Sequence, residues 1–109
     1  MGRGIAIWAA AALALTHAAA AAELPAAERQ IKLLSLLEQD CGSCHGLTMK
    51  GGLGPALLPK TLADKPDDFL VDTILYGRPG TPMPPWAFEI TPDEAKWLVH
   101  RLRGWRNDG

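Results

Sequence analysis

The sequence has little net charge, no strand-like patterning and few cysteines, and each of these shortages excludes a class of fold or of function. Its formal net charge is −1 with histidine taken as neutral, and it contains no run of basic residues. This argues against nucleic-acid binding. There is no internal repeat and no strand-like alternation of apolar and polar residues, which favours an all-α fold. Cys41 and Cys44 are the only cysteines, so one pair must carry any cysteine chemistry.

Residues 1–22 differ in composition from the rest of the chain. A charged start, an apolar middle and an end of small residues follow one another: Met1–Gly4 with Arg3, Ile5–Leu15 and Ala18–Ala22. This order is typical of a secretory signal peptide. The alternative is an uncleaved membrane anchor, which needs about 20 apolar residues. Thr16 and His17 interrupt the stretch and alanine is only weakly apolar, so we expect cleavage near Ala20–Ala22.

Cleavage would divide the chain into a signal peptide, residues 1–22, and one mature domain, residues 23–109. We therefore expect export to the periplasm and no stable membrane anchor. A domain this small buries a modest core and usually needs a disulfide, a metal or an oligomer interface for stability. A covalent cofactor in the middle of the core would meet that need.

The mature part contains three segments with helical patterning, separated by two loops rich in glycine and proline. The predicted helices are Leu24–Asp40, Pro66–Tyr76 and a third that opens at Thr91 and ends at Gly104. The predicted loops are Gly46–Lys60 and Gly77–Ile90, where the density of helix breakers excludes a long regular element. The third helix also has a predicted cap, because Thr91, Pro92 and Glu94 follow the pattern of a capping box with proline at the first position.

Apolar residues at helical spacing mark the sides of the helices that we expect to be buried. On the first helix these are Ile31, Leu33, Leu34, Leu36 and Leu37. On the second helix they are Phe69, Leu70, Ile74 and Leu75. In the first loop, burial is expected for Leu53, Leu57 and Leu58.

One short motif carries most of the chemical information. Cys41-Gly42-Ser43-Cys44-His45 is the Cys-x-x-Cys-His pattern of c-type haem attachment. Two thiols at this spacing can add across the two vinyl groups on one edge of a porphyrin, and the adjacent imidazole can then swing under the ring and bind iron. The motif therefore predicts one covalent haem c, with His45 as an axial iron ligand.

Three other uses of a Cys-x-x-Cys pair fit this chain less well. A thioredoxin-like redox pair belongs in a βαβ setting, and no strands are predicted here. A structural zinc site needs four ligands, whereas this chain offers the pair with His45 and His100. A disulfide between cysteines so close in sequence closes a very short loop and adds little stability.

A sixth iron ligand is expected from Met83, far along the chain from His45. Pro82 and Pro84 hold its backbone extended and stiff, which suits a thioether that must face iron. The alternative is a core methionine, but those usually lie on helices among aliphatic side chains. Met49 and His100 are competing ligands. Met49 is too close in sequence to His45 to reach the opposite haem face easily, and on the last helix a solvent-facing or core-edge histidine is expected.

Longer motifs of the mature chain resemble class I cytochromes c, from about Leu24 to Trp105. The resemblance rests on Cys-Gly-Ser-Cys-His-Gly, Gly-Gly-Leu-Gly-Pro-Ala-Leu, Leu-Tyr-Gly-Arg-Pro-Gly-Thr-Pro-Met-Pro-Pro-Trp and a capped final helix. It implies a small all-α fold of three helices wrapped around one haem, with Gly/Pro-rich loops. The compact size and the segment around Met83 more narrowly resemble the NirC-type cytochromes, small periplasmic proteins found with haem cd nitrite reductase.

The resemblance also implies roles for three residues around the haem. Pro55 matches the proline whose carbonyl usually accepts a hydrogen bond from the ring of the proximal histidine; a simple turn proline is the alternative. Arg78 and Trp86 flank Met83 and would hydrogen-bond the haem propionates, because arginine pairs well with carboxylates. An exposed, solvated Arg78 is the alternative.

The function that we expect is single-electron transfer without catalysis, because iron with both axial positions filled has no position for a substrate. His/Met ligation would favour ferrous iron and raise the potential. The protein would be a monomer with redox proteins as partners, among them haem cd nitrite reductase, or would serve the maturation of that enzyme's haem. Alternatives are a carrier for a periplasmic dehydrogenase or oxidase, and a peroxidase or gas-binding protein in which Met83 does not bind iron.

Overall fold

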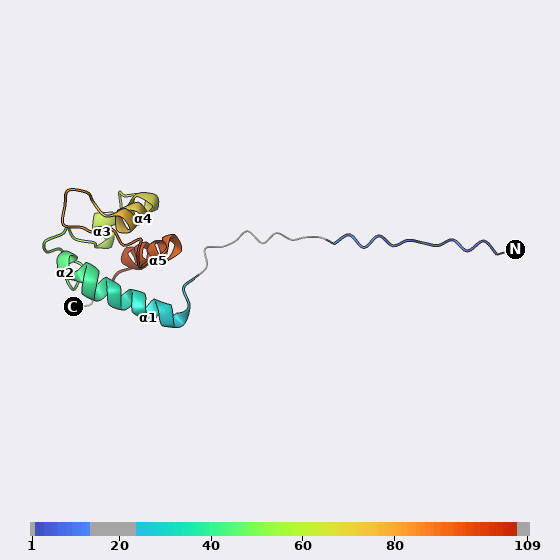
Figure 1. The fold of residues 1–109 in the computed structure, drawn as a ribbon, viewed down its shortest axis with the longest axis horizontal. Helices are drawn as coiled ribbons and strands as arrows, with labels where there is room; N and C mark the ends of the chain where they lie inside the picture. The colour runs from blue at the N-terminus through green and yellow to red at the C-terminus, as the bar shows by residue number, and fades with distance from the viewer. Residues whose placement is uncertain (1, 14–23, 107–109) are drawn as a thin grey trace.

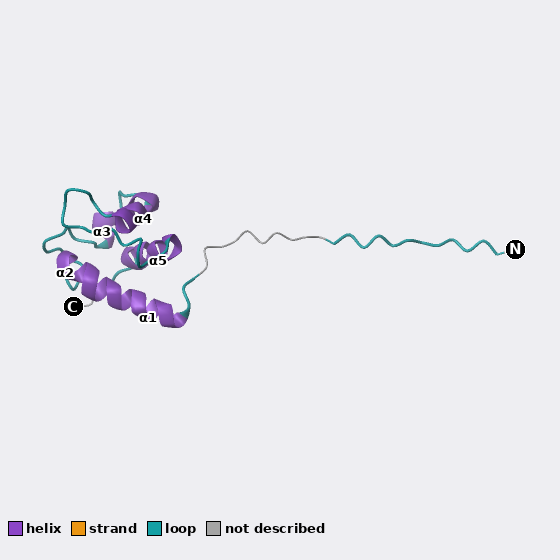
Figure 2. Ribbon diagram, in the orientation of Figure 1, coloured by secondary structure: helices purple, strands orange, loops and turns teal. Residues whose placement is uncertain are grey.

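Helices form all the regular structure in the part of the chain that the computed structural model describes, residues 2–13 and 24–106 (Figure 1; Figure 2). In chain order they are α1 Ala27–Leu36, the π-helix η1 Leu37–Cys41, α2 Gly42–His45, α3 Pro59–Leu62, α4 Asp67–Tyr76 and α5 Pro92–Arg103. No strand occurs in these residues, and the all-α prediction is confirmed.

The first helix is longer than the sequence predicts. It begins at Ala27 rather than Leu24, and α1, η1 and α2 then follow one another without a break, past Asp40 to His45. Figure 1 shows them as one rod along one side of the helical domain. Gly42 and Ser43 have low intrinsic helix propensity, but Gly42 is buried and the following loop is bonded to this helix end, where the Gly54 N–H donates to the Cys44 carbonyl oxygen at 2.8 Å. The whole haem-attachment motif therefore lies on a helix.

The other two predicted helices are close to their expected bounds. α4 begins at Asp67, and Pro66 is its N-cap rather than its first residue. The predicted capping box of α5 is confirmed: the Glu94 N–H donates to Thr91 Oγ1 at 3.2 Å and the Thr91 N–H donates to Glu94 Oε1 at 2.9 Å. The predicted loop Gly46–Lys60 is shorter than expected, because Pro59 starts the short helix α3.

α5 is the centre of the packing, since α1, α3 and α4 all contact it. The core is built from apolar side chains of the long helices and of the segments between them: Leu33, Leu36, Leu37, Met49, Leu62, Val71, Leu75, Ile90, Ala95, Leu98, Val99 and Leu102. Leu57, Leu58, Leu70 and Ile74 are half-buried against it.

Three residues expected to be buried are exposed instead. Ile31 is 69% exposed, so the predicted apolar side of α1 is only partly covered, whereas Leu33 and Leu36 on the same helix are buried. Phe69 and Leu53 are also exposed, yet both line a large cavity. Their apolar surface therefore faces the cavity rather than the core.

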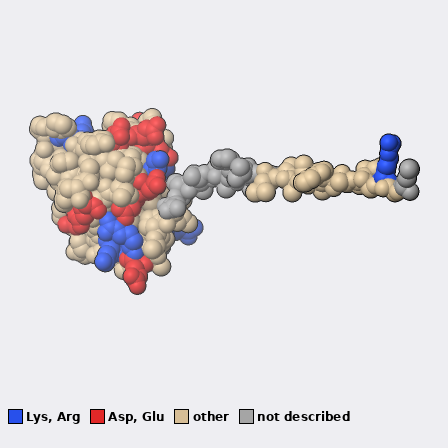
Figure 3. All heavy atoms as spheres, turned by 45° about the vertical axis from the view of Figure 1, so that its right-hand side comes forward, with Lys and Arg blue, Asp and Glu red and all other residues tan. Residues whose placement is uncertain are grey.

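Two arginines connect elements that are distant in sequence. Arg29 of α1 pairs with Glu94 of α5 and donates from Nη2 to the Glu89 carbonyl oxygen at 2.8 Å. This pairing holds the pKa of the Glu94 carboxyl below its usual value. Arg103 of α5 donates to Asp67 Oδ1 at 2.7 Å, which ties α5 to the start of α4. On the face shown in Figure 3, acidic and basic side chains lie in small separate groups.

The predicted leader is described only in part. Residues 2–13 form neither helix nor strand, and within the described ranges no helix has the length and apolar character needed to span a membrane. The predicted cleavage site near Ala20–Ala22 lies outside the described residues. The division into residues 1–22 and 23–109 therefore stays a prediction.

Candidate cofactor site

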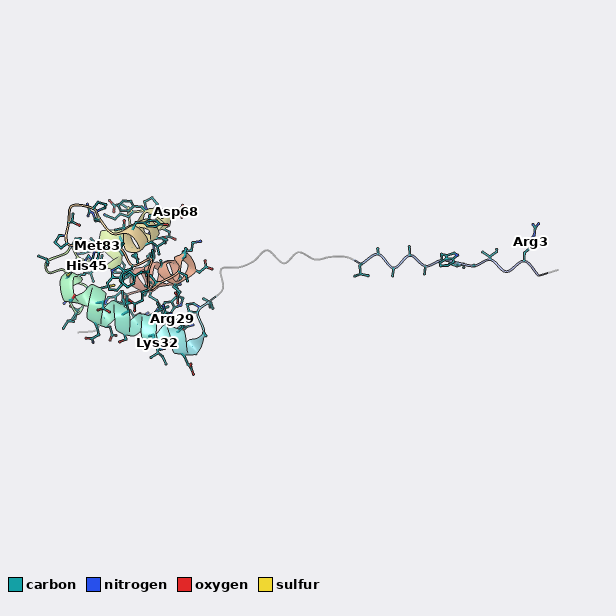
Figure 4. The ribbon with its side chains drawn as sticks, viewed as in Figure 1. Arg3, Arg29, Lys32, His45, Asp68 and Met83 are labelled. Atoms are coloured by element: carbon teal, nitrogen blue, oxygen red, sulfur yellow. The ribbon has the colours of Figure 1, made fainter. Side chains whose placement is uncertain are left out.

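A cavity of about 640 Å³ lies between the helix end at His45 and the loop that follows α4. This volume is within the range of about 300–1,000 Å³ that is usual for cofactor sites. The cavity wall includes every site residue proposed from the sequence: Cys41, Cys44, His45, Pro55, Arg78, Met83 and Trp86. Figure 4 shows His45 and Met83 at the same end of the domain, one from the helix end and one from the loop.

The cysteines share a helix face with His45. Residues three and four positions apart on a helix lie on the same side, so the unbroken run through α2 directs Cys41, Cys44 and His45 to the cavity. Both cysteines are free thiols and half-buried. Burial, and after it the nearby Asp40 carboxylate, raises the pKa of the Cys41 thiol to about 11.

The His45 imidazole is buried and fixed by one hydrogen bond. Its Nδ1 lies 2.7 Å from the Pro55 carbonyl oxygen, the contact that the family resemblance implies. Because a carbonyl can only accept, Nδ1 carries a proton, and in the neutral imidazole Nε2 then keeps its lone pair. Gly54 makes this contact possible, since a Cβ there would lie 2.8 Å from His45 Nδ1 and Cε1.

We call residues 77–87 the distal strap, because they cross the cavity and carry Met83. Both ends of the strap are attached to the last turn of α4. Gly77 begins it at φ 67°, and the Trp86 and Ala87 N–H groups donate to the Leu75 carbonyl oxygen at 3.1 and 3.0 Å. These bonds satisfy a helix-end carbonyl that would otherwise lack a partner. The strap is thus a closed loop on α4.

Met83 is held through its backbone. Its carbonyl oxygen accepts from the Arg78 N–H at 3.2 Å, and its N–H donates to Thr81 Oγ1 at 3.3 Å. The Thr81 hydroxyl in turn donates to the Arg78 carbonyl oxygen at 2.6 Å. Thr81 is not among the site residues expected from the sequence. Threonine hydroxyls nevertheless often bond to the backbone of a residue two positions further along the chain.

Gly77, the first residue of the strap, lies against the backbone of Met83 and Pro84. A Cβ at Gly77 would lie 2.7 Å from the Met83 carbonyl oxygen and from the Pro84 carbonyl carbon. The backbone of the strap therefore rests directly on the end of α4. Only glycine combines this close approach with the positive φ.

The two competing ligands lie away from the cavity. Met49 is fully buried in the hydrophobic core and does not line the cavity wall. His100 is exposed on α5, beside a separate shallow groove that also includes Arg101 and Trp105. Met83 is therefore the methionine that the fold brings to the same cavity as His45.

The remaining two proposed residues line the cavity from the strap. Arg78 is exposed, and Trp86 is half-buried with its ring stacked on Phe88 at a centroid distance of 5.8 Å. The structure also places Thr61, Lys65 and Thr73 on the cavity wall, which the sequence did not indicate.

The residues present fit a covalently attached haem. Two free thiols, one imidazole nitrogen with a lone pair and one thioether face the same space, and most of the wall is apolar. Among the described residues no cluster of three or more His, Cys, Asp or Glu side chains could hold a metal ion directly.

Comparison with known proteins agrees with this reading. Residues 32–100 match the family model described as cytochrome c oxidase, cbb3-type, subunit III. Cytochrome c55X of Pseudomonas aeruginosa is 59% identical over 95 residues, which cover 84% of this chain and 80% of the relative. The solved structure of the c-type cytochrome NirC superposes with a TM-score of 0.72 at 60% identity, covering 73% of this chain and 94% of that one.

A further relative is a larger protein. Dihydro-heme d1 dehydrogenase of Pseudomonas aeruginosa is 38% identical over 68 residues, which cover 62% of this chain and 14% of that protein. A domain of this kind is thus one part of an enzyme.

Fold and site together define a c-type cytochrome, an electron carrier with covalent haem c rather than an enzyme. Within that class, the chain belongs to the family of small NirC-type cytochromes, which includes the cytochromes c55X. The resemblance drawn from the motifs, the fold class and the haem c prediction are confirmed.

Proposed function

We propose that the protein is a periplasmic single-electron carrier in which Cys41 and Cys44 attach the haem, and His45 and Met83 bind its iron. The observation that carries this proposal is the convergence of all four side chains on one cavity. Bound haem supplies a ferrous–ferric couple, which is the chemistry that one-electron transfer requires.

His45 and Pro55 set one axial side of the site. The Nδ1–H donates to the Pro55 carbonyl, which fixes the plane of the imidazole and leaves Nε2 to face the metal. Such a contact also raises the basicity of the ligand and so helps to set the potential. The helix places His45 beside the cavity, and the Pro55 carbonyl in the following loop determines that Nδ1 is the ring nitrogen that donates.

Met83 sets the other axial side. A thioether favours ferrous iron and raises the potential relative to a harder ligand. With His45 and Met83 bound to it, the iron would have no position left for a substrate. Partner contacts of such carriers are usually small and transient.

Arg78 and Trp86 are proposed to meet the haem propionates at the strap. The exposed position of Arg78 leaves its guanidinium free to pair with a carboxylate at the cavity edge. The Trp86 indole N–H is a donor without acceptor capacity, so a propionate oxygen suits it.

The partners we propose are enzymes of the nitrite reductase pathway, haem cd nitrite reductase first among them. The names of the NirC and dihydro-heme d1 dehydrogenase relatives support this assignment. Stopped-flow mixing of the reduced cytochrome with oxidised nitrite reductase tests it. Rapid reoxidation that saturates with enzyme concentration is expected, and reoxidation no faster than with an unrelated haem protein contradicts it.

A role in maturation of haem d1 is the second candidate. The observation that favours it is the related domain inside a dehydrogenase named for dihydro-heme d1. In that case the cytochrome would accept electrons from the dehydrogenase rather than supply the reductase. Reduction of the oxidised cytochrome during turnover of that enzyme distinguishes the two directions.

Export is proposed from the composition of residues 1–22. Mass spectrometry of the purified cytochrome should give a mature protein that begins near Ala21–Leu24. An intact Met1 terminus in a membrane fraction would instead favour the anchor.

The axial ligands can be tested on the unaltered protein. The oxidised form should show the weak near-infrared-edge absorption band of a methionine–iron bond, and the reduced form should not bind carbon monoxide readily. Absence of that band together with rapid carbon monoxide binding would favour a peroxidase or gas-binding protein.

A further inference from the structure

Met49 has an unusual backbone conformation. Among the described residues it is the only one other than glycine with positive φ, at 60°. This conformation is strained for a residue with a side chain, and it persists only where the surroundings hold it. Glycine would adopt it without strain. The presence of methionine therefore indicates that its side chain contributes something that glycine could not.

The Met49 side chain is an anchor in the core. Its exposed fraction is 0%, and it packs in the cluster that contains Leu33 and Leu37 of the first helix. In the segment between α2 and α3, residues 46–58, it is the only buried side chain, whereas Leu47 and Leu53 are more than two-thirds exposed at 71% and 78%. Met49 is thus the fully buried anchor of this segment, whereas Leu57 and Leu58 are half-buried against the same core.

The backbone of Met49 closes the loop that presents Pro55. The Met49 N–H donates to the Gly46 carbonyl oxygen at 2.9 Å, and the Leu57 N–H donates to the Met49 carbonyl oxygen at 2.9 Å. Pro55 lies inside the loop so closed. The Gly54 N–H, directly before it, donates to the Cys44 carbonyl oxygen at 2.8 Å, which brings the loop back onto the helix end.

We propose that Met49 is a positioning residue: its buried side chain fixes the loop that holds the Pro55 carbonyl against His45 Nδ1, and thereby sets the reduction potential of the cytochrome. The inference rests on the proposed role of His45 as iron ligand. If the anchor is lost, the loop opens more often and the hydrogen bond weakens. The imidazole then becomes less basic and stabilises ferric iron less, so the potential rises.

Three substitutions in the holoprotein separate the anchor from the backbone strain. Met49→Ala removes the anchor and keeps the strain, Met49→Gly removes both, and Met49→Leu keeps a buried side chain of similar size. The readouts are the exchange rate of the His45 Nδ1 proton by NMR and the midpoint potential. We expect at least about tenfold faster exchange and a higher potential in the alanine and glycine variants, with values near wild type for leucine.

Leu33→Ala is the matched control. Leu33 is 1% exposed in the same core but lies on α1 and does not line the cavity. The control should lower the melting temperature while leaving the exchange rate and the potential unchanged. An equal shift of both readouts in this control would show that Met49 acts only through general stability, and would overturn the proposal.

Other outcomes are equally decisive. Met49→Gly should fold even where Met49→Ala does not, because glycine removes the strain. An exchange rate and a potential at the wild-type values in Met49→Gly would overturn the proposal. If the wild-type protein itself lacks an iron-shifted His45 ring signal, the ligand assignment fails and this inference with it. A normal wild-type signal with unaffected variants overturns the inference alone.

Discussion

The two walls of the cavity that carry His45 and Met83 are built in different ways. On the proximal side, residues 41–55, the cysteines and His45 lie on one helix, and the imidazole is fixed by the loop that follows directly. On the distal side, Met83 lies on a strap without helix or strand, attached at both ends to α4. One wall is rigid because of helical hydrogen bonds, and the other because of prolines and a few loop contacts.

This difference determines what each wall can tolerate. A helix places residues at fixed angular spacing, so Cys41, Cys44 and His45 of the proximal wall need only the correct sequence spacing to share a face. The distal strap has no repeating hydrogen bonds, and the position of Met83 depends on individual contacts with Gly77, Arg78 and Thr81. We therefore expect single changes in the strap to alter iron ligation without loss of the haem, and changes in the motif to alter attachment itself.

The largest effect is expected from the proximal cysteines. Cys41→Ala together with Cys44→Ala removes both thioether bonds, so haem should be lost or held only by coordination. Denaturing gel electrophoresis with haem-peroxidase staining measures this, with the single variants as intermediate cases. Full covalent haem in the double variant would contradict the attachment site.

Removal of the distal ligand should have a smaller but qualitative effect. Met83→Ala opens the sixth position, so the iron should become high-spin or take water and bind cyanide or carbon monoxide readily. The potential should fall, because the thioether's preference for ferrous iron is lost. Covalent haem should be retained, in contrast to the cysteine variants. An unchanged spectrum in Met83→Ala would disprove the assignment.

Two glycine substitutions compare the walls directly. Gly54→Ala places a Cβ 2.8 Å from the His45 ring, whereas Gly77→Ala places one 2.7 Å from the Met83 carbonyl oxygen at positive φ. Each should lower the free energy of unfolding by about 1–3 kcal/mol. Only Gly77→Ala should weaken the methionine–iron band. Chemical unfolding and the oxidised spectrum give both readouts.

Gly80→Ala is the control for that comparison. Gly80 also has positive φ, at 80°, but no atom lies within 4 Å of a Cβ placed there. Gly80→Ala should lower the free energy of unfolding by about 1 kcal/mol, the cost of a side chain at positive φ, and should leave the oxidised spectrum unchanged. A weakened band in Gly80→Ala would mean that any strain in the strap suffices, and that the contact at Gly77 is not special.

The smallest effect is expected at Thr81. Thr81→Val removes the hydroxyl that joins Arg78 to the Met83 N–H, which should destabilise the closed strap by about 1 kcal/mol. Apparent cyanide affinity should rise about fivefold, because the open form is more populated. Thr73→Val is the matched control, since that hydroxyl lines the same cavity but bonds only to Phe69 of its own helix, at 2.7 Å. Equal effects in both variants would rule out a specific role for Thr81.

Much of the fold could be predicted from the sequence, with errors of a recognisable kind. The capping box at Thr91 and the helix α4 could be predicted because caps and helical periodicity are local features. The continuation of the first helix through Gly42 could not, since it depends on packing that overrides a low propensity. Ile31 was assigned to the buried face because periodicity indicates a face but not how much of it a partner covers.

The chemistry at the attachment motif follows from residues that are neighbours in the chain. Cys41, Cys44 and His45 lie within one helical turn or little more, so their spacing alone brings them together. The return of Met83 to the same cavity, the burial of Met49 and the exclusion of His100 were decided by the tertiary structure. The physical reason is that a side chain from a distant loop reaches the cavity only when α4, α5 and the strap pack in one arrangement, and no local pattern specifies how packed elements meet.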